Sequence, residues 1–169
     1  IFENQPAVIE PVNFVLAPDS IYTHTFVPTV DMSAIGDYEF RIFTDLMGDD
    51  APFNDTLRLV RSQIPRYDAG ITAIGGPDGI TCGNELPVQL TLQNFGFLSL
   101  TTVTIDVSLN GAPFTTINWT GDLPFGESTI VDITLTGLAD GNNTVAARVS
   151  QPNGETDEVM SNDLSSRDF

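Results

Sequence analysis

Apolar and polar residues alternate along most of this 169-residue chain, and a two-residue period is the pattern of half-buried β-strands. The clearest run is 86–93, where Leu86, Val88, Leu90 and Leu92 fall on one face. The same alternation recurs over residues 103–109, 114–119, 131–135 and 145–149. No segment carries a sustained apolar pattern with the period of a helix. The pattern therefore predicts an all-β fold.

The dipeptide Asn110-Gly111 stands directly between two of these runs. A two-residue type I′ turn needs positive φ at both central positions, and Asn-Gly is the pair best suited to it. We therefore expect a tight hairpin joining residues 103–109 to residues 114–119.

Two parts of the chain present the same features in the same order. In each, a turn that contains proline, with aspartate in the first copy and glycine in the second, precedes an alternating run. A glycine then opens a further run, and an acidic loop ends in Asn-Asp. These features fall at residues 16–20, 21–29, Gly36, 38–44 and 54–55, and again at 123–128, 129–136, Gly141, 144–150 and 162–163. Offsets of 105 to 108 residues are typical of tandem β-sandwich domains.

The opening strands of the second copy, within residues 67–109, have no counterpart before Ile1. We therefore expect residues 1–64 to be the C-terminal part of one Ig-like sandwich and residues 65–169 to be a complete one. Pro65 biases the junction toward extended geometry, and so short a linker would hold successive domains nearly end to end. Either upstream sequence or a neighbouring subunit would complete the first copy.

The run Leu92-Gln93-Asn94-Phe95-Gly96 ends a strand in Asn-x-Gly, and 48–56 closes a copy in an acidic Asn-Asp loop. With the turn before each alternating run, this order resembles the CARDB-type, fibronectin-III-like repeat. Such repeats are found in secreted and cell-surface multidomain proteins, especially those of Bacteroidetes-type bacteria. The resemblance covers residues 67–163 as a whole module and 1–60 as a partial one. It implies spacers, adhesin shafts or accessory modules beside catalytic domains.

The chain has a formal net charge of −17, with 23 acidic residues, six arginines and no lysine. Such a surface repels phosphate backbones, which argues against nucleic-acid binding. The missing lysine excludes a Schiff base and a Lys-Asn isopeptide crosslink. No apolar run is long enough to span a bilayer, so we expect no membrane insertion.

Catalytic candidates are few. His24 is the only histidine, which excludes a His-based metal cluster, and its alternating run favours a structural strand position. The single Cys82 has no partner base nearby in sequence, so a buried small residue is the favoured interpretation. We therefore expect no enzyme.

The acidic loops are the remaining candidate sites. Calcium prefers carboxylate and carbonyl oxygens, and Asp45, Asp49, Asp50, Asp55, Asp157, Glu158 and Asp163 supply them. Neither loop has EF-hand spacing, and Asp and Asn also initiate turns, so calcium binding and plain turn chemistry both stay open; no other cofactor is expected. Trp119 is either a core residue or a stacking platform for a sugar.

Two functions follow from these observations. The first is a structural repeat of an extracellular or cell-surface bacterial protein, whose partners are neighbouring repeats or identical subunits. The alternative is an accessory module that binds a ligand or carbohydrate beside a secreted hydrolase.

Overall fold

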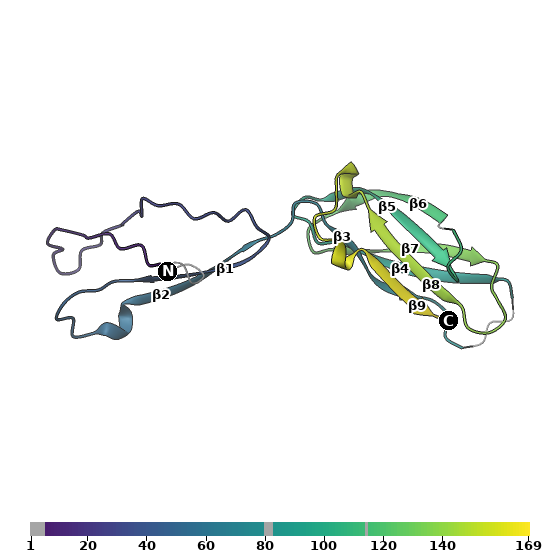
Figure 1. Ribbon diagram of the computed structural model, residues 1–169, viewed down its shortest axis with the longest axis horizontal. Coiled ribbons are helices and arrows are strands. Elements are labelled where there is room, and N and C mark those ends of the chain that lie inside the picture. Colours follow the sequence, from purple (N-terminus) through teal and green to yellow (C-terminus); the bar gives the residue numbers. More distant parts are fainter. Residues whose placement is uncertain (1–5, 80–82, 114) are drawn as a thin grey trace. The chain divides into compact units, whose positions relative to one another are not determined.

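The chain folds as two units, Ile1–Ile64 (unit 1) and Pro65–Phe169 (unit 2). The computed structural model describes residues 6–79, 83–113 and 115–169, and Figure 1 labels its strands. All secondary structure consists of antiparallel strands and three single turns of 3₁₀ helix among the described residues. The expected all-β fold is confirmed.

Unit 2 consists of two antiparallel sheets that pack face to face. The first has the order β3 (Ala69–Gly75), β4 (Glu85–Asn94), β7 (Ser128–Thr136). The second has the order β6 (Thr115–Leu123), β5 (Leu100–Leu109), β8 (Thr144–Ser150), β9 (Leu164–Asp168). Between them lies one core, to which the described residues contribute fifteen buried apolar side chains, mainly from β3, β4, β5 and β8. The predicted alternation is confirmed here, since Leu86, Val88, Leu90 and Leu92 are all buried.

The turn at Asn110-Gly111 has the expected geometry. Both residues have positive φ, 53° at Asn110 and 73° at Gly111, and the amide of Ala112 donates to the carbonyl of Leu109 at 2.9 Å. Strands β5 and β6 pair directly across this turn, so the predicted hairpin is confirmed.

Asn94 is a polar side chain inside unit 2 that forms hydrogen bonds to three backbone groups. Its side chain is buried, and its Nδ2 donates to the carbonyls of Leu98 (2.9 Å) and Leu123 (2.8 Å). Its Oδ1 accepts the amide of Gly96 at 3.0 Å. The Asn-x-Gly motif thus satisfies three backbone groups where β4 turns toward β5.

Unit 1 holds one two-stranded sheet of β1 (Gly36–Phe43) and β2 (Thr56–Gln63), with a 3₁₀ turn, η1 (Pro52–Asn54), between them. The strand expected over residues 21–29 is not formed, so that prediction was wrong. The described residues before Gly36 have turns and irregular backbone only. Many large apolar side chains of unit 1 are consequently exposed, among them Ile42 and Leu57.

Replacing Asn94 by Ala is expected to destabilise unit 2 by about 2–4 kcal/mol, because the carbonyls of Leu98 and Leu123 lose this donor inside the fold and the amide of Gly96 keeps only its bond to the carbonyl of Asp68. Denaturant unfolding followed by circular dichroism measures this loss. The matched control is Gln93→Ala, which removes a single exposed hydrogen bond to the carbonyl of Gly126 and is expected to cost less than about 1 kcal/mol. Equal losses in the two variants would contradict the role given to Asn94.

Candidate functional site

The acidic loops of the two units have the same local structure. In unit 1 the 3₁₀ turn η1 ends at Asn54, Asp55 follows in helical geometry, and β2 begins at the next residue. In unit 2 the 3₁₀ turn η3 (Met160–Asn162) is followed by Asp163 in helical geometry, and then by β9. The Asn-Asp pair read from the sequence therefore ends a 3₁₀ turn and leads into a strand in both places.

Hydrogen bonds in the two loops also correspond. Asp49 Oδ1 accepts the amide of Ala51 at 2.7 Å, and Asp157 Oδ1 accepts the amide of Val159 at 2.9 Å. The Asp55 carbonyl accepts the amide of Thr44 at 3.0 Å. The Asp163 carbonyl accepts the amide of Val149, also at 3.0 Å. The partners differ by 105 or 108 positions, which are the offsets found in the sequence.

Only in unit 2 do the described contacts join this loop to a second sheet, at the start of β3. Asp157 Oδ2 accepts the amide of Ala69 at 3.0 Å, and Asn162 Nδ2 donates to Asp68 Oδ1 at 2.8 Å. Asp68 is 4% exposed and Asp157 is 8% exposed. These bonds bring Asp68 to a loop that lies some 90 positions later in the sequence. We call Asp68, Asp157, Asn162 and Asp163 the acidic cluster.

Glu158 lies beside the cluster but serves the backbone. Its Oε2 accepts the amide of Arg66 at 2.9 Å, and its own amide donates to the carbonyl of Tyr67 at 3.0 Å. In unit 1, Asp45 and Asp50 are exposed, while Asp55 Oδ1 accepts the hydroxyl of Thr44 at 3.0 Å. The seven predicted acids therefore separate into the pair Asp157 and Asp163, which the cluster contains, and five that lie outside it.

Two acceptors of the acidic cluster are buried without a donor, Asn162 Oδ1 and Asp163 Oδ1. Burial and the nearby carboxylates of Asp157 and Asp68 raise the pKa of Asp163 to about 6. Burial also raises the pKa of Asp68, against the hydrogen bond from Asn162. Each shift means that the charged carboxylate is disfavoured. No positively charged group is among the causes acting on Asp68 or Asp163.

A cavity of about 280 Å³ opens at the cluster. Asp157 and Asp163 line it, together with Ser150, Gln151, Gly154, Glu155, Thr156 and Met160. Within the described residues, no three His, Cys, Asp or Glu side chains already stand in the arrangement of a metal site. Of the acidic cluster, Asp157 and Asp163 line the cavity and the other two members do not.

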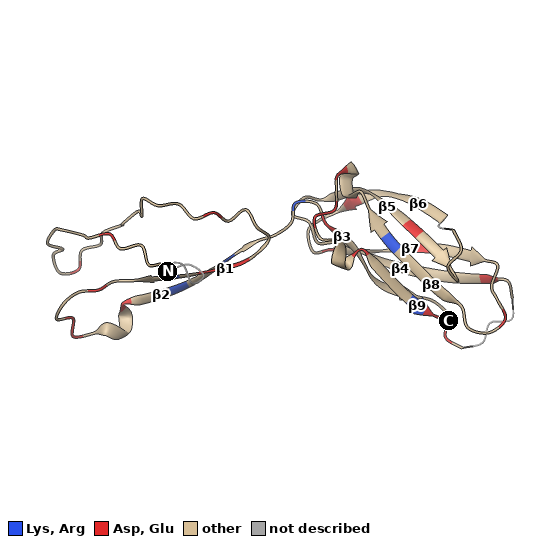
Figure 2. Cartoon of the chain, in the orientation of Figure 1, with Lys and Arg blue, Asp and Glu red and all other residues tan. Residues whose placement is uncertain are grey.

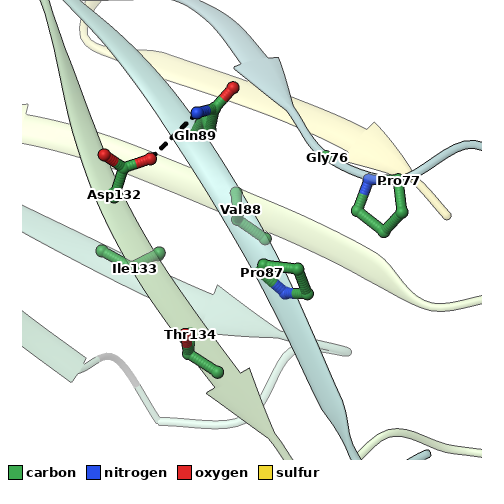
Figure 3. A pocket seen from close by; sticks show the side chains of 8 residues that line it. All are labelled: Gly76, Pro77, Pro87, Val88, Gln89, Asp132, Ile133 and Thr134. Carbon is green, nitrogen blue, oxygen red and sulfur yellow. Dashed lines mark hydrogen bonds between the residues drawn. The ribbon is translucent and has the colours of Figure 1, made fainter.

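A larger hollow of about 420 Å³ lies along β4 and β7 (Figure 3). Gln89 and Asp132 face one another across these strands, with Gln89 Nε2 donating to Asp132 Oδ1 at 3.0 Å. The other lining residues are Gly76, Pro77, Pro87, Val88, Ile133 and Thr134. Asp132 is the one ionisable side chain of this lining, so the hollow offers no acid–base pair.

The remaining candidates lie elsewhere. His24 Nε2 is 2.8 Å from Glu10 Oε2, a hydrogen-bonding partner that the sequence did not reveal. Trp119 is half-buried and packs against the core of unit 2, where its ring lies over Gly121. Cys82 lies outside the described residues. Among those residues no helix is both long and apolar enough to traverse a bilayer.

Comparison with known proteins identifies the fold. No protein-family model matches the chain, and no curated protein matches it. A crystal structure of the CARDB domain of the PF1109 protein from Pyrococcus furiosus, in complex with di-metal ions, is similar with a TM-score of 0.53. It is 20% identical and covers 64% of this chain and 96% of that chain. A solution NMR structure of the same domain has a TM-score of 0.48 at 20% identity, over 63% of this chain and 94% of that one.

The matched share of the chain is close to the share that unit 2 makes up. A CARDB-type β-sandwich fold is therefore confirmed for the matched part. At this identity the likeness concerns the fold alone, and the neighbour is archaeal, so the expected Bacteroidetes-type context has no support from it.

Asp163→Asn is expected to stabilise the chain at pH 7 in EDTA by about 1–2 kcal/mol, since it removes a half-buried charge beside two carboxylates. The folded-state pKa of about 6 exceeds the ordinary value of 3.8, so the folded state binds the proton more tightly. Tighter proton binding stabilises the folded wild type at low pH. That stabilisation is lost as the pH rises from 3.8 to about 6, whereas the variant has no proton to lose at this position.

Thermal unfolding across this pH range measures the difference between the two proteins. Asp55→Asn is the matched control, because Asp55 occupies the same backbone position and has a hydroxyl donor in Thr44. A variant no more stable than the wild type at pH 7 would show that Asp163 is already neutral or paired.

Proposed function

We propose that the chain is part of a tandem array of non-catalytic structural repeats in an extracellular or cell-surface bacterial protein. Unit 1 is the C-terminal part of one CARDB-type sandwich, and unit 2 is the next. The observation that best supports this proposal is the match between the two acidic loops. Each has a 3₁₀ turn that ends at an Asn-Asp pair, an Asp carbonyl that accepts the same type of backbone hydrogen bond, and a strand that follows directly.

The register of the strands extends this match to the face on which their side chains lie. Phe40 pairs with Leu59 and Ile42 pairs with Leu57 across β1 and β2. At the corresponding positions of unit 2, Val145 pairs with Arg167 and Ala147 pairs with Ser165 across β8 and β9. Val145 and Ala147 are fully buried in the core. The hairpin face of Phe40, Ile42, Leu57 and Leu59 is thus the one that a second sheet would cover.

The irregular backbone over residues 21–29 supports the same proposal. Its counterpart in unit 2 is β7, which pairs with β4 alone. An alternating run gains little from extending without a neighbour to hydrogen-bond with. In the proposed array, strands equivalent to β3, β4 and β5 come from sequence N-terminal to residue 1, and residues 21–29 then pair as β7 does.

Surface charge favours such a role over binding to nucleic acid. In Figure 2, the ribbon positions of Asp and Glu, coloured red, lie on both units, and those of Lys and Arg, coloured blue, are few, in keeping with the net charge of −17. The arginines at Arg58, Arg148 and Arg167 form ion pairs with Glu39, Asp106 and Asp78. The exposed surface therefore presents chiefly negative charge, which suits a soluble spacer outside the cell.

Substitutions on opposite faces of β2 test the proposal, in the chain extended N-terminally along its natural sequence. Leu57 and Val60 are equally open in the present structure, at 60% and 55% exposed, but only Leu57 shares a face with Leu59. In the extended chain, Leu57→Ser is expected to destabilise unit 1 by about 2–4 kcal/mol, as burial of a leucine implies. Val60→Ser is expected to change stability by less than about 1 kcal/mol.

Hydrogen exchange gives the second readout. Amides of residues 21–29 are expected to exchange freely in the 169-residue chain and to be protected in the extended chain. Equal effects of the two substitutions, together with no gain in protection, would contradict the array.

A further inference from the structure

Asp163 has a carboxylate for which the described residues provide no hydrogen bond, and one of its oxygens is buried. Asn162 Oδ1 beside it is also buried without a donor, and the orientation of its amide is fixed because Nδ2 already donates to Asp68. Buried polar atoms nearly always have a partner. Both unpartnered atoms are acceptor oxygens, so a hydrogen-bond donor or a cation would satisfy them and another acceptor would not.

Asp68 adds another buried carboxylate to this region. It is almost fully buried, and the amide of Asn162 reaches only its Oδ1. The nearest arginine in sequence does not neutralise it, since the guanidinium of Arg66 lies over the ring of Tyr67 at 5.4 Å. A buried carboxylate is costly when no positive charge or metal compensates it, even where it accepts a hydrogen bond as Asp68 does.

The space for a ligand is present. Asp157 and Asp163 both line the cavity of about 280 Å³. Both oxygens of Asp157 accept backbone amides, which fixes the carboxylate and still leaves a lone pair on each oxygen. Ser150, Glu155 and Thr156 line the same cavity and offer further oxygens.

We propose that unit 2 binds one hard divalent cation of the calcium type in this cavity, with Asp163 and Asp157 as carboxylate ligands and Asp68 as a buried negative charge behind them. Calcium accepts six to eight oxygens in flexible geometry and takes several from carbonyls and water. Two carboxylates with hydroxyl, carbonyl and water oxygens suffice for it. The bound ion is held by the β8–β9 loop, which itself contacts the start of β3 through the hydrogen bonds of Asp157 and Asn162.

The proposal is tested by titrating the wild-type chain with CaCl₂ in a calorimeter at pH 7.5, after treatment with EDTA. One saturable site is expected, together with a rise in Tm on adding calcium that is reversed by EDTA. The Tm control is NaCl at the same ionic strength, because screening alone stabilises a chain of such net charge. No saturable heat, or a Tm rise that NaCl reproduces in full, would overturn the proposal.

Two variants locate the site. Asp163→Asn is expected to weaken calcium binding by about tenfold or more, since affinity follows the number of charged ligands. Asp122→Asn removes the same charge from an exposed position of unit 2 and is expected to leave the affinity within about twofold. Equal weakening in both variants, or undiminished binding in Asp163→Asn, would place any bound calcium elsewhere and overturn the assignment.

Discussion

Unit 2 depends on central strands that hydrogen-bond on both edges while burying one face. β4 lies between β3 and β7, and β5 lies between β6 and β8. Each supplies buried side chains to the same core, Leu90 and Leu92 from β4 and Ile105 and Val107 from β5. The edge strands β6 and β7 have one neighbour each, so they are ordered only when a central strand is in place.

This constraint explains why similar sequence patterns have different outcomes in the two units. Residues 128–136 and residues 21–29 alternate in the same way, and only the former are a strand. The alternation records which face is apolar but carries no information on whether a neighbour is present. Unit 1 keeps β1 and β2 because they pair with one another, so the run predicted over residues 38–44 lies largely within a strand while the run over residues 21–29 does not form one.

The site shows a similar division between local and long-range information. Turn chemistry could be predicted from Asp49, Asp157 and the Asn-Asp pairs, since these bonds span two to a few residues. Asp68 was missed as a site residue because its partner Asn162 lies 94 positions away, and no spacing rule links them. The seven acids proposed as ligands look equivalent in sequence. Burial separates Asp157 and Asp163 from the rest, and burial follows from which strand the loop meets.

Turn formation and the proposed cation binding are therefore compatible uses of one loop rather than rival interpretations. The backbone bonds of the Asp-x-x-x-x-Asn-Asp loop shape it in both units and need no ion. Apposition to β3 then buries Asp163 near two other carboxylates, a cost that the loop of unit 1 avoids through the hydroxyl of Thr44. Val149 stands at the position corresponding to Thr44 and has no hydroxyl to offer. Without such a donor, the buried oxygen of Asp163 has no partner among the described residues, and this is the difference between the two loops on which the proposed cation site rests.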